Sequence, residues 1–179
     1  QLWRSAYTNA TGELRNSIAK KLGEHYFAEG QASFARANQP GGREEDLNIA
    51  LYNFQQAIEF DRDNQEIVNM IQATYQEIKE RTEYRNMLVG IISQAEKTQE
   101  EAEKYRLSGD YGNAILTYRI AASLYNSVDD RFKDLESNAK SGLRRVRKSI
   151  SDVINEILDR ASDAIDQGDQ HKENNRFEE

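Results

Sequence analysis

The two histidines of the chain, His25 and His171, are its most obvious candidates for metal binding or acid–base chemistry. Neither has a cysteine, a second histidine or an acidic residue at the spacing of metal ligands, so both are expected to be packing or half-exposed side chains. Cysteine is absent, which excludes disulfides, thiolate ligands and a cysteine nucleophile. Gly41-Gly42 follows Pro40 and lacks the lysine and serine of a phosphate-binding loop. We therefore predict no catalytic residue, no metal and no cofactor, and we expect that the protein is not an enzyme.

One segment with three carboxylates resembles the start of a calcium-binding loop. Its sequence is Asp61-Arg-Asp-Asn-Gln-Glu66. It lacks the glycine that such a loop needs at its sharp turn, and Gln72 stands where the last glutamate ligand is required. The same residues suit a connection between two helices, in which Asp63 or Asn64 caps a helix that begins near Gln65. We predict the helix cap and no calcium site.

A run of basic residues is the strongest local charge feature, and it consists of Lys140, Arg144, Arg145, Arg147 and Lys148. It lies on a predicted amphipathic helix in which Leu143 and Val146 face inward. Nucleic acid or an anionic lipid surface could bind such a patch. The net charge of −7 and the pI of about 5.1 argue against a nucleic-acid-binding protein. We favour a solvated face, or complementarity to the acidic segment 100–103 or to a protein partner.

Composition predicts helix nearly throughout the chain. Gln, Glu, Ala, Lys, Arg and Leu are abundant, and the only proline is Pro40, so helix propensity is almost unopposed from Leu47 onward. No apolar stretch approaches the roughly 18 to 20 residues of a membrane-spanning helix. We expect a soluble protein that does not insert into a membrane. Its location is expected to be either the cytoplasm or the periplasm. The start at Gln1 and the stop at 174–179 favour a larger parent protein.

The clearest structural pattern runs from 102 to 121. It predicts a helix, a tight turn at Gly109-Asp-Tyr111 and a second helix, with small residues where the two helices touch. The residues at helical spacing are Ala102, Tyr105, Ala114, Tyr118 and Ala121. A related pattern begins at Leu22-Gly23-Glu-His-Tyr26 and resumes at Ala50 and Phe54. The segment 38–42, whose proline and two glycines disfavour helix, lies between these two parts of the pattern. The helix that contains Leu22 and Tyr26 is therefore predicted to run to about Ala37.

These patterns resemble the tetratricopeptide repeat (TPR) family, whose units are helix pairs of about 34 residues. The resemblance implies an all-α, TPR-like α-solenoid of antiparallel helix pairs, stacked because one unit cannot bury its apolar face alone. The predicted parts are an N-terminal segment 1–15, a first unit 16–64 with a loop insertion 38–46, a degenerate second unit 65–94, a third unit 95–128, a long amphipathic helix 129–160, and the start of a further, truncated unit 161–179. In the second unit, the repeat pattern places the first helix at 68–75 and the second helix at 84–91.

Two stretches depart from the repeat because their apolar residues follow a heptad. The first contains Tyr84, Leu88, Ile91, Ala95, Thr98, Ala102 and Tyr105, and the second contains Phe132, Leu135, Ala139, Leu143, Val146, Ile150, Val153 and Ile157. Gly142 is the weak position of the second stretch. Such spacing predicts unusually long helices of well over 20 residues. We favour packing of these helices within the chain and keep oligomerisation through the heptads as the alternative.

The family resemblance also implies a function and a site. First helices of such repeats line a concave groove that binds a peptide, a helix or a folded subunit. The residues expected to line it are Lys20, Glu24, Phe27, Asn69, Ala73, Gln76, Gln99, Glu103 and Arg106. Because Glu24 stands where a carboxylate clamp would need asparagine, we disfavour binding of a C-terminal carboxylate. Apolar contacts such as those of Phe27 are expected to provide the affinity.

The leading interpretation is therefore a non-catalytic scaffold or adaptor that holds a protein or peptide partner in a larger complex, with a bacterial, envelope-associated assembly as one setting. Two alternatives stay open. The chain could be a structural building block that self-associates through its long heptad-patterned helices, or a regulatory domain of a larger enzyme.

Overall fold

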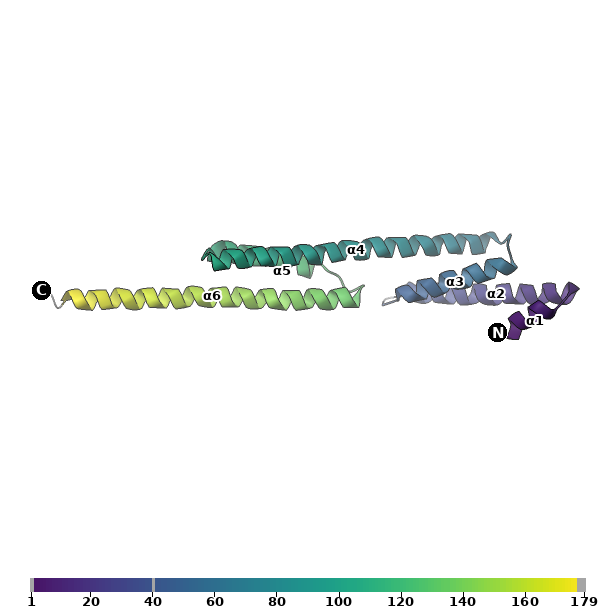
Figure 1. The fold of residues 1–179 in the computed structure, drawn as a ribbon, viewed down its shortest axis with the longest axis horizontal. Helices are drawn as coiled ribbons and strands as arrows, with labels where there is room; N and C mark the ends of the chain where they lie inside the picture. Colours follow the sequence, from purple (N-terminus) through teal and green to yellow (C-terminus); the bar gives the residue numbers. More distant parts are fainter. Residues whose placement is uncertain (1, 40, 177–179) are drawn as a thin grey trace. The chain divides into compact units, whose positions relative to one another are not determined.

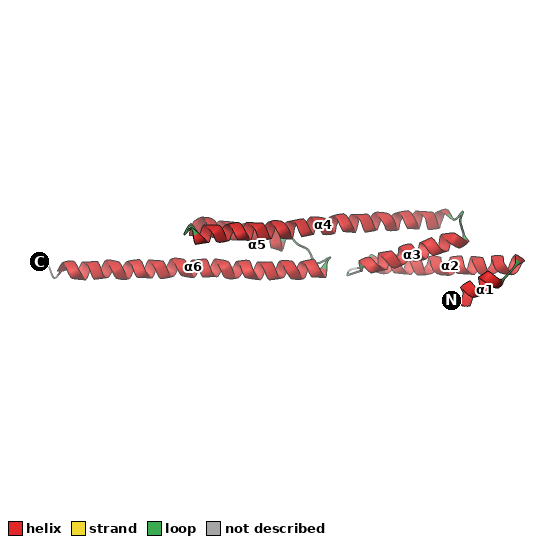
Figure 2. Ribbon diagram, in the orientation of Figure 1, coloured by secondary structure: helices red, strands yellow, loops and turns green. Residues whose placement is uncertain are grey.

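The computed structural model describes residues 2–39 and 41–176, with side chains described up to residue 170 except that of Trp3. Across these residues the chain is helical and has no strand (Figures 1 and 2). The helices are α1 (Leu2–Asn9), α2 (Gly12–Ala37), α3 (Glu44–Phe60), α4 (Gln65–Leu107), α5 (Tyr111–Asn126) and α6 (Lys133–Arg176). The prediction of an all-α chain is confirmed. The chain divides into two compact units, Gln1–Tyr84 and Arg85–Glu179.

In the first unit, α2 packs against α3 where small and aromatic residues alternate. The core consists of Ala50, Phe54 and Ala57 of α3 with Ile67 of α4. A Cβ atom on Gly30 would lie 2.6 Å from the ring of Phe54, so the absence of a side chain lets the two helices approach. Gly23 is also buried, and a Cβ there would lie 3.4 Å from Phe60. The glycine and aromatic residues of the sequence pattern thus lie where α2 contacts α3.

A second cluster ties the short helix α1 to α2. Ala10, Ile18 and Leu22 are buried together, and the rings of Tyr7 and Phe60 meet edge to face with centroids 5.3 Å apart. The predicted N-terminal segment 1–15 therefore contributes a helix and part of the core.

The connection between α2 and α3 is held by Arg81, which lies on α4. Helix α2 ends at Ala37, as predicted, and α3 begins at Glu44, so the acidic residues 44–46 form its first turn. The Arg81 guanidinium donates to the carbonyl oxygen of Ala37 at 2.8 Å and to Asn38 Oδ1 at 3.2 Å. These bonds satisfy acceptors at the end of α2 that have no partner within the helix.

Helix α4 begins at Gln65, and the predicted cap is confirmed at Asn64. Its Oδ1 atom accepts from the backbone N–H groups of Glu66 and Ile67 at 3.0 and 3.3 Å. The helix then runs without a break for 43 residues. Where the repeat alignment has two helices, at 68–75 and 84–91, the structure has one, because the sequence between them contains no proline or glycine that would end a helix.

In the second unit, α4 and α5 form the helix-turn-helix predicted from the clearest pattern. Gly109 has φ +82°, which favours glycine, and the Asp110 carboxylate accepts from the backbone N–H of Asn113. Ala102, Ala114 and Ala121 are fully buried, and Tyr118 is nearly so. The small residues therefore lie where the helices touch.

Helix α6 packs against α5 and carries the second heptad stretch from Leu135 onward. Leu135, Ala139, Val146 and Val153 are buried, whereas Ile157 is 38% exposed. Gly142 is buried under Tyr125, and a Cβ atom on it would lie 2.3 Å from the ring. The long helices α4 and α6, of 43 and 44 residues, confirm the length prediction. Of the first heptad stretch, Leu88, Ala95, Thr98 and Ala102 are buried in the second unit.

Candidate partner-binding surfaces

The predicted groove residues of the first unit lie on α2 and on the first part of α4. Lys20 and Glu24 are exposed on α2, while Phe27 is half-buried and its ring lies 5.8 Å from that of Phe54. Phe27 therefore contributes to the core as well as to the surface. On α4, Asn69, Ala73 and Gln76 are exposed, and the two amides bond along their own helix, to Gln65 and Glu80.

The groove residues predicted in the second unit are engaged in a polar network between helices. Glu103 accepts from the Tyr118 hydroxyl of α5 and pairs with Arg106 at 3.1 Å. Arg106 also donates from Nε to Glu156 of α6 at 2.9 Å. These contacts join α4 to both α5 and α6. Glu103 and Arg106 thus hold the unit together at this point, and Gln99 is half-buried one turn earlier.

Proton affinities in this network follow from its contacts. Arg106 donates hydrogen bonds to the Glu156 carboxylate. These bonds lower the pKa of the Glu156 carboxyl and raise the pKa of the Arg106 guanidinium. Burial, reinforced by the hydrogen bond to Glu103, raises the pKa of Tyr118 to about 12. The folded chain therefore favours an ionised Glu156 and a neutral Tyr118.

This network predicts a contribution to acid sensitivity. A carboxyl whose pKa is lower in the folded than in the unfolded chain stabilises the fold above its unfolded pKa of about 4.5, and this contribution is lost as the pH falls through the folded pKa. Urea unfolding midpoints, measured in steps from pH 6 to about pH 3, should fall less steeply in Glu156→Gln than in the parent chain. Glu100→Gln, at an exposed site on α4, is the control. Parallel curves for Glu156→Gln and the parent would contradict the assignment.

The predicted basic patch lies on the outward side of α6. Val146 is buried and Leu143 half-buried, as expected, while all five basic residues are exposed. Lys140 pairs with Glu136 at 2.5 Å on the same helix. A shallow hollow on this side is lined by Glu136, Ser137, Lys140, Leu143, Arg144 and Arg147.

The second half of α6 bears an apolar surface that the sequence analysis did not identify. Ile154, Leu158 and Ile165 are 44%, 60% and 64% exposed, although they belong to one regular helix. Acidic residues accompany them: Asp152, Glu156, Asp159, Asp163, Asp166 and Asp169. The predicted heptad ends at Ile157, in a register different from that of this surface. The sequence signal for the surface is a second apolar row with spacings of four, three and four, which consists of Ile154, Leu158, Ala161 and Ile165.

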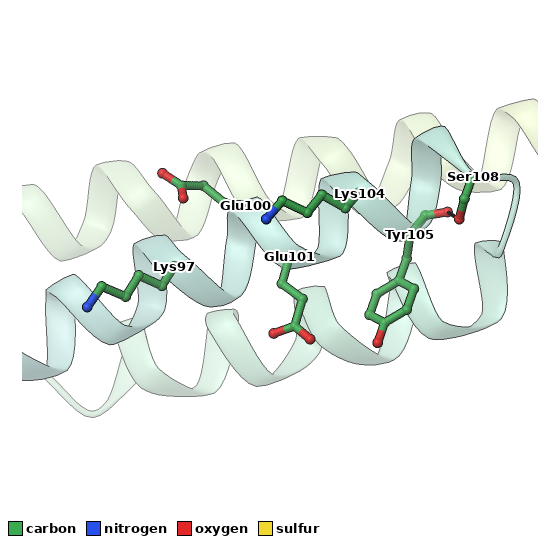
Figure 3. Close-up of a pocket in the computed structure, with 6 residues that line it drawn as sticks. All are labelled: Lys97, Glu100, Glu101, Lys104, Tyr105 and Ser108. Carbon is green, nitrogen blue, oxygen red and sulfur yellow. Dashed lines mark hydrogen bonds between the residues drawn. The ribbon is translucent and has the colours of Figure 1, made fainter.

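A further hollow lies along α4 and offers little for chemistry. Its lining residues are Lys97, Glu100, Glu101, Lys104, Tyr105 and Ser108. Five of them belong to this helix and Ser108 to the turn that follows it, and Figure 3 shows that their side chains point in different directions rather than toward one centre. Among the side chains that the structure describes, no group of three or more histidine or acidic residues could hold a metal ion. His25 is exposed, and the side chain of His171 lies outside the described part.

None of the described helices is long and apolar enough to cross a membrane. No family model, curated protein or solved structure matches the chain.

Proposed function

We propose that this chain is a non-catalytic protein-interaction scaffold that holds a protein or peptide partner within a larger complex, and that its repeat-like helix pairs belong to a TPR-like solenoid. The observation that carries the proposal is the exposed apolar row Ile154, Leu158 and Ile165 on an otherwise regular helix. Apolar side chains of this size gain free energy when another surface removes them from water. Acidic residues beside the row provide a polar rim, as protein interfaces commonly have.

The predicted groove residues support the same role from another surface. Lys20, Glu24, Asn69 and Gln76 are exposed, so they can contact a partner without rearrangement of the core. Because Glu103 and Arg106 already bind within the second unit, we expect them to position the helices rather than to provide the main contacts.

The test is a binding measurement with partners that purify with the complete protein from its native source. For each identified partner, the double variant Leu158→Ser/Ile165→Ser should raise the Kd at least tenfold, because two exposed apolar side chains are removed. The matched control is Leu116→Ser/Ile120→Ser on α5, where the parent side chains are 57% and 56% exposed. Equal Kd values for the parent and both variants, with every partner, would refute the α6 surface as the interaction site.

One observation favours the building-block alternative, in which the chain binds copies of itself. Basic and acidic residues are separated along α6, so the two halves of the helix carry complementary charges.

A further inference from the structure

We propose that a second copy of this chain binds along α6 in antiparallel orientation, with the basic half of each helix against the acidic, apolar half of the other. This inference rests on the proposed function only in its use of α6 as the interaction helix.

One continuous face of α6 is exposed. Residues at alternating spacings of three and four share this face: Lys140, Arg144, Arg147, Ser151, Ile154, Leu158, Ala161 and Ile165. All of them are exposed, and the buried residues Val146 and Val153 lie on another side of the helix. At a rise of about 1.5 Å per residue the face is roughly 40 Å long. Spacing of this kind is typical of helices that pair along their length.

Charge is distributed unevenly along this helix. The segment 140–148 has five basic residues and no acidic one, whereas 152–169 has six acidic residues and one basic residue, Arg160. Pairing the acidic halves of two copies would cover the apolar row but bring like charges together, which is unfavourable. Pairing two copies in parallel and in register has the same defect. Antiparallel pairing centred near Ser151 instead brings each acidic half to a basic half.

This antiparallel arrangement is self-complementary, as a two-fold symmetric dimer requires. With the centre near Ser151, Arg144 of one copy lies level with Asp159 of the other, and both occupy the same flank of the shared face. The symmetry axis repeats this pair. Leu158 and Ile165 then meet the hollow that Lys140, Leu143 and Arg144 help to line. The aliphatic stems of lysine and arginine can cover apolar side chains while their charged ends stay in water.

Charge reversal provides the main test, with the molar mass of the full chain measured by light scattering at tens of micromolar. We expect a dimer for the parent chain in about 50 mM salt and a Kd at least tenfold higher in about 500 mM salt, because salt screens exposed charges. Arg144→Glu/Arg147→Glu and Asp159→Lys/Asp166→Lys should each be monomeric. An equimolar mixture of the two variants should dimerise again, because each reversed half then meets an oppositely charged half.

Circular dichroism shows whether each variant remains helical, and a cysteine pair tests the direction. The parent contains no cysteine, so a mixture of Arg144→Cys and Asp159→Cys chains should form a mixed disulfide on mild oxidation, and it should do so faster than a mixture of Arg144→Cys and Arg147→Cys chains.

A monomeric parent chain, a mixture that fails to dimerise, or reversed variants that still dimerise alone would each overturn this inference. A monomeric parent that still loses its partner upon Leu158→Ser/Ile165→Ser would leave the proposed scaffold function in place.

Discussion

Phe54→Ala is expected to lower the free energy of unfolding of the first unit by about 3–5 kcal/mol, the usual range for truncating a buried aromatic side chain. Phe54 is fully buried, and its ring lies against Phe27 and over Gly30 of α2. Removing it withdraws apolar area from the core and leaves a cavity that rigid helices cannot close completely. Urea unfolding, monitored by circular dichroism, measures this loss of stability. A separate unfolding transition at lower urea concentration would assign the loss to the first unit.

The control for Phe54→Ala is available two residues away on the same helix. Tyr52 is also aromatic but 54% exposed, so Tyr52→Ala should change the unfolding free energy by about 0.5 kcal/mol or less, as exposed substitutions do. If both variants lost the same stability, the packing of α2 on α3 described above would be wrong.

Features set by neighbouring residues were predicted well from the sequence. The end of α2 at Ala37, the cap at Asn64 and the turn at Gly109 each depend on contacts or backbone angles within a few positions. Such local rules act in the same way whatever the rest of the chain does. The buried alanines of α5 were found for a related reason, because small residues at helical spacing indicate a close helix contact.

Features set by distant residues were not predictable in the same way. Gly142 looked like a weak position in α6 because glycine disfavours helix, but Tyr125, from another helix, occupies the space beside it. Arg106 looked like a groove residue, and its contact with Glu156 depends on how α4 and α6 pack. Which helices meet is decided by tertiary packing, and a single sequence contains no direct record of it.

The contrast between local and tertiary effects also applies to two glycines of α6. Replacing each by alanine is expected to change the free energy of unfolding in opposite directions. Glycine to alanine in a helix normally stabilises by about 0.5–1 kcal/mol, because glycine loses more backbone entropy on folding. At Gly168, where an added Cβ would have nothing within 4 Å, Gly168→Ala should show that gain as a higher urea midpoint.

At Gly142, the added methyl would lie 2.3 Å from the ring of Tyr125, whose side chain is only 2% exposed and therefore has little room to move. Overpacking of this kind typically costs about 1–3 kcal/mol, which exceeds the helix-propensity gain. Gly142→Ala should therefore lower the unfolding midpoint of the second unit, and Tyr125→Leu in the same chain should recover part of the loss by making space. If Gly142→Ala instead raised the unfolding midpoint, helix propensity alone would determine the change in stability. The close contact between Tyr125 of α5 and Gly142 of α6 would then be wrong.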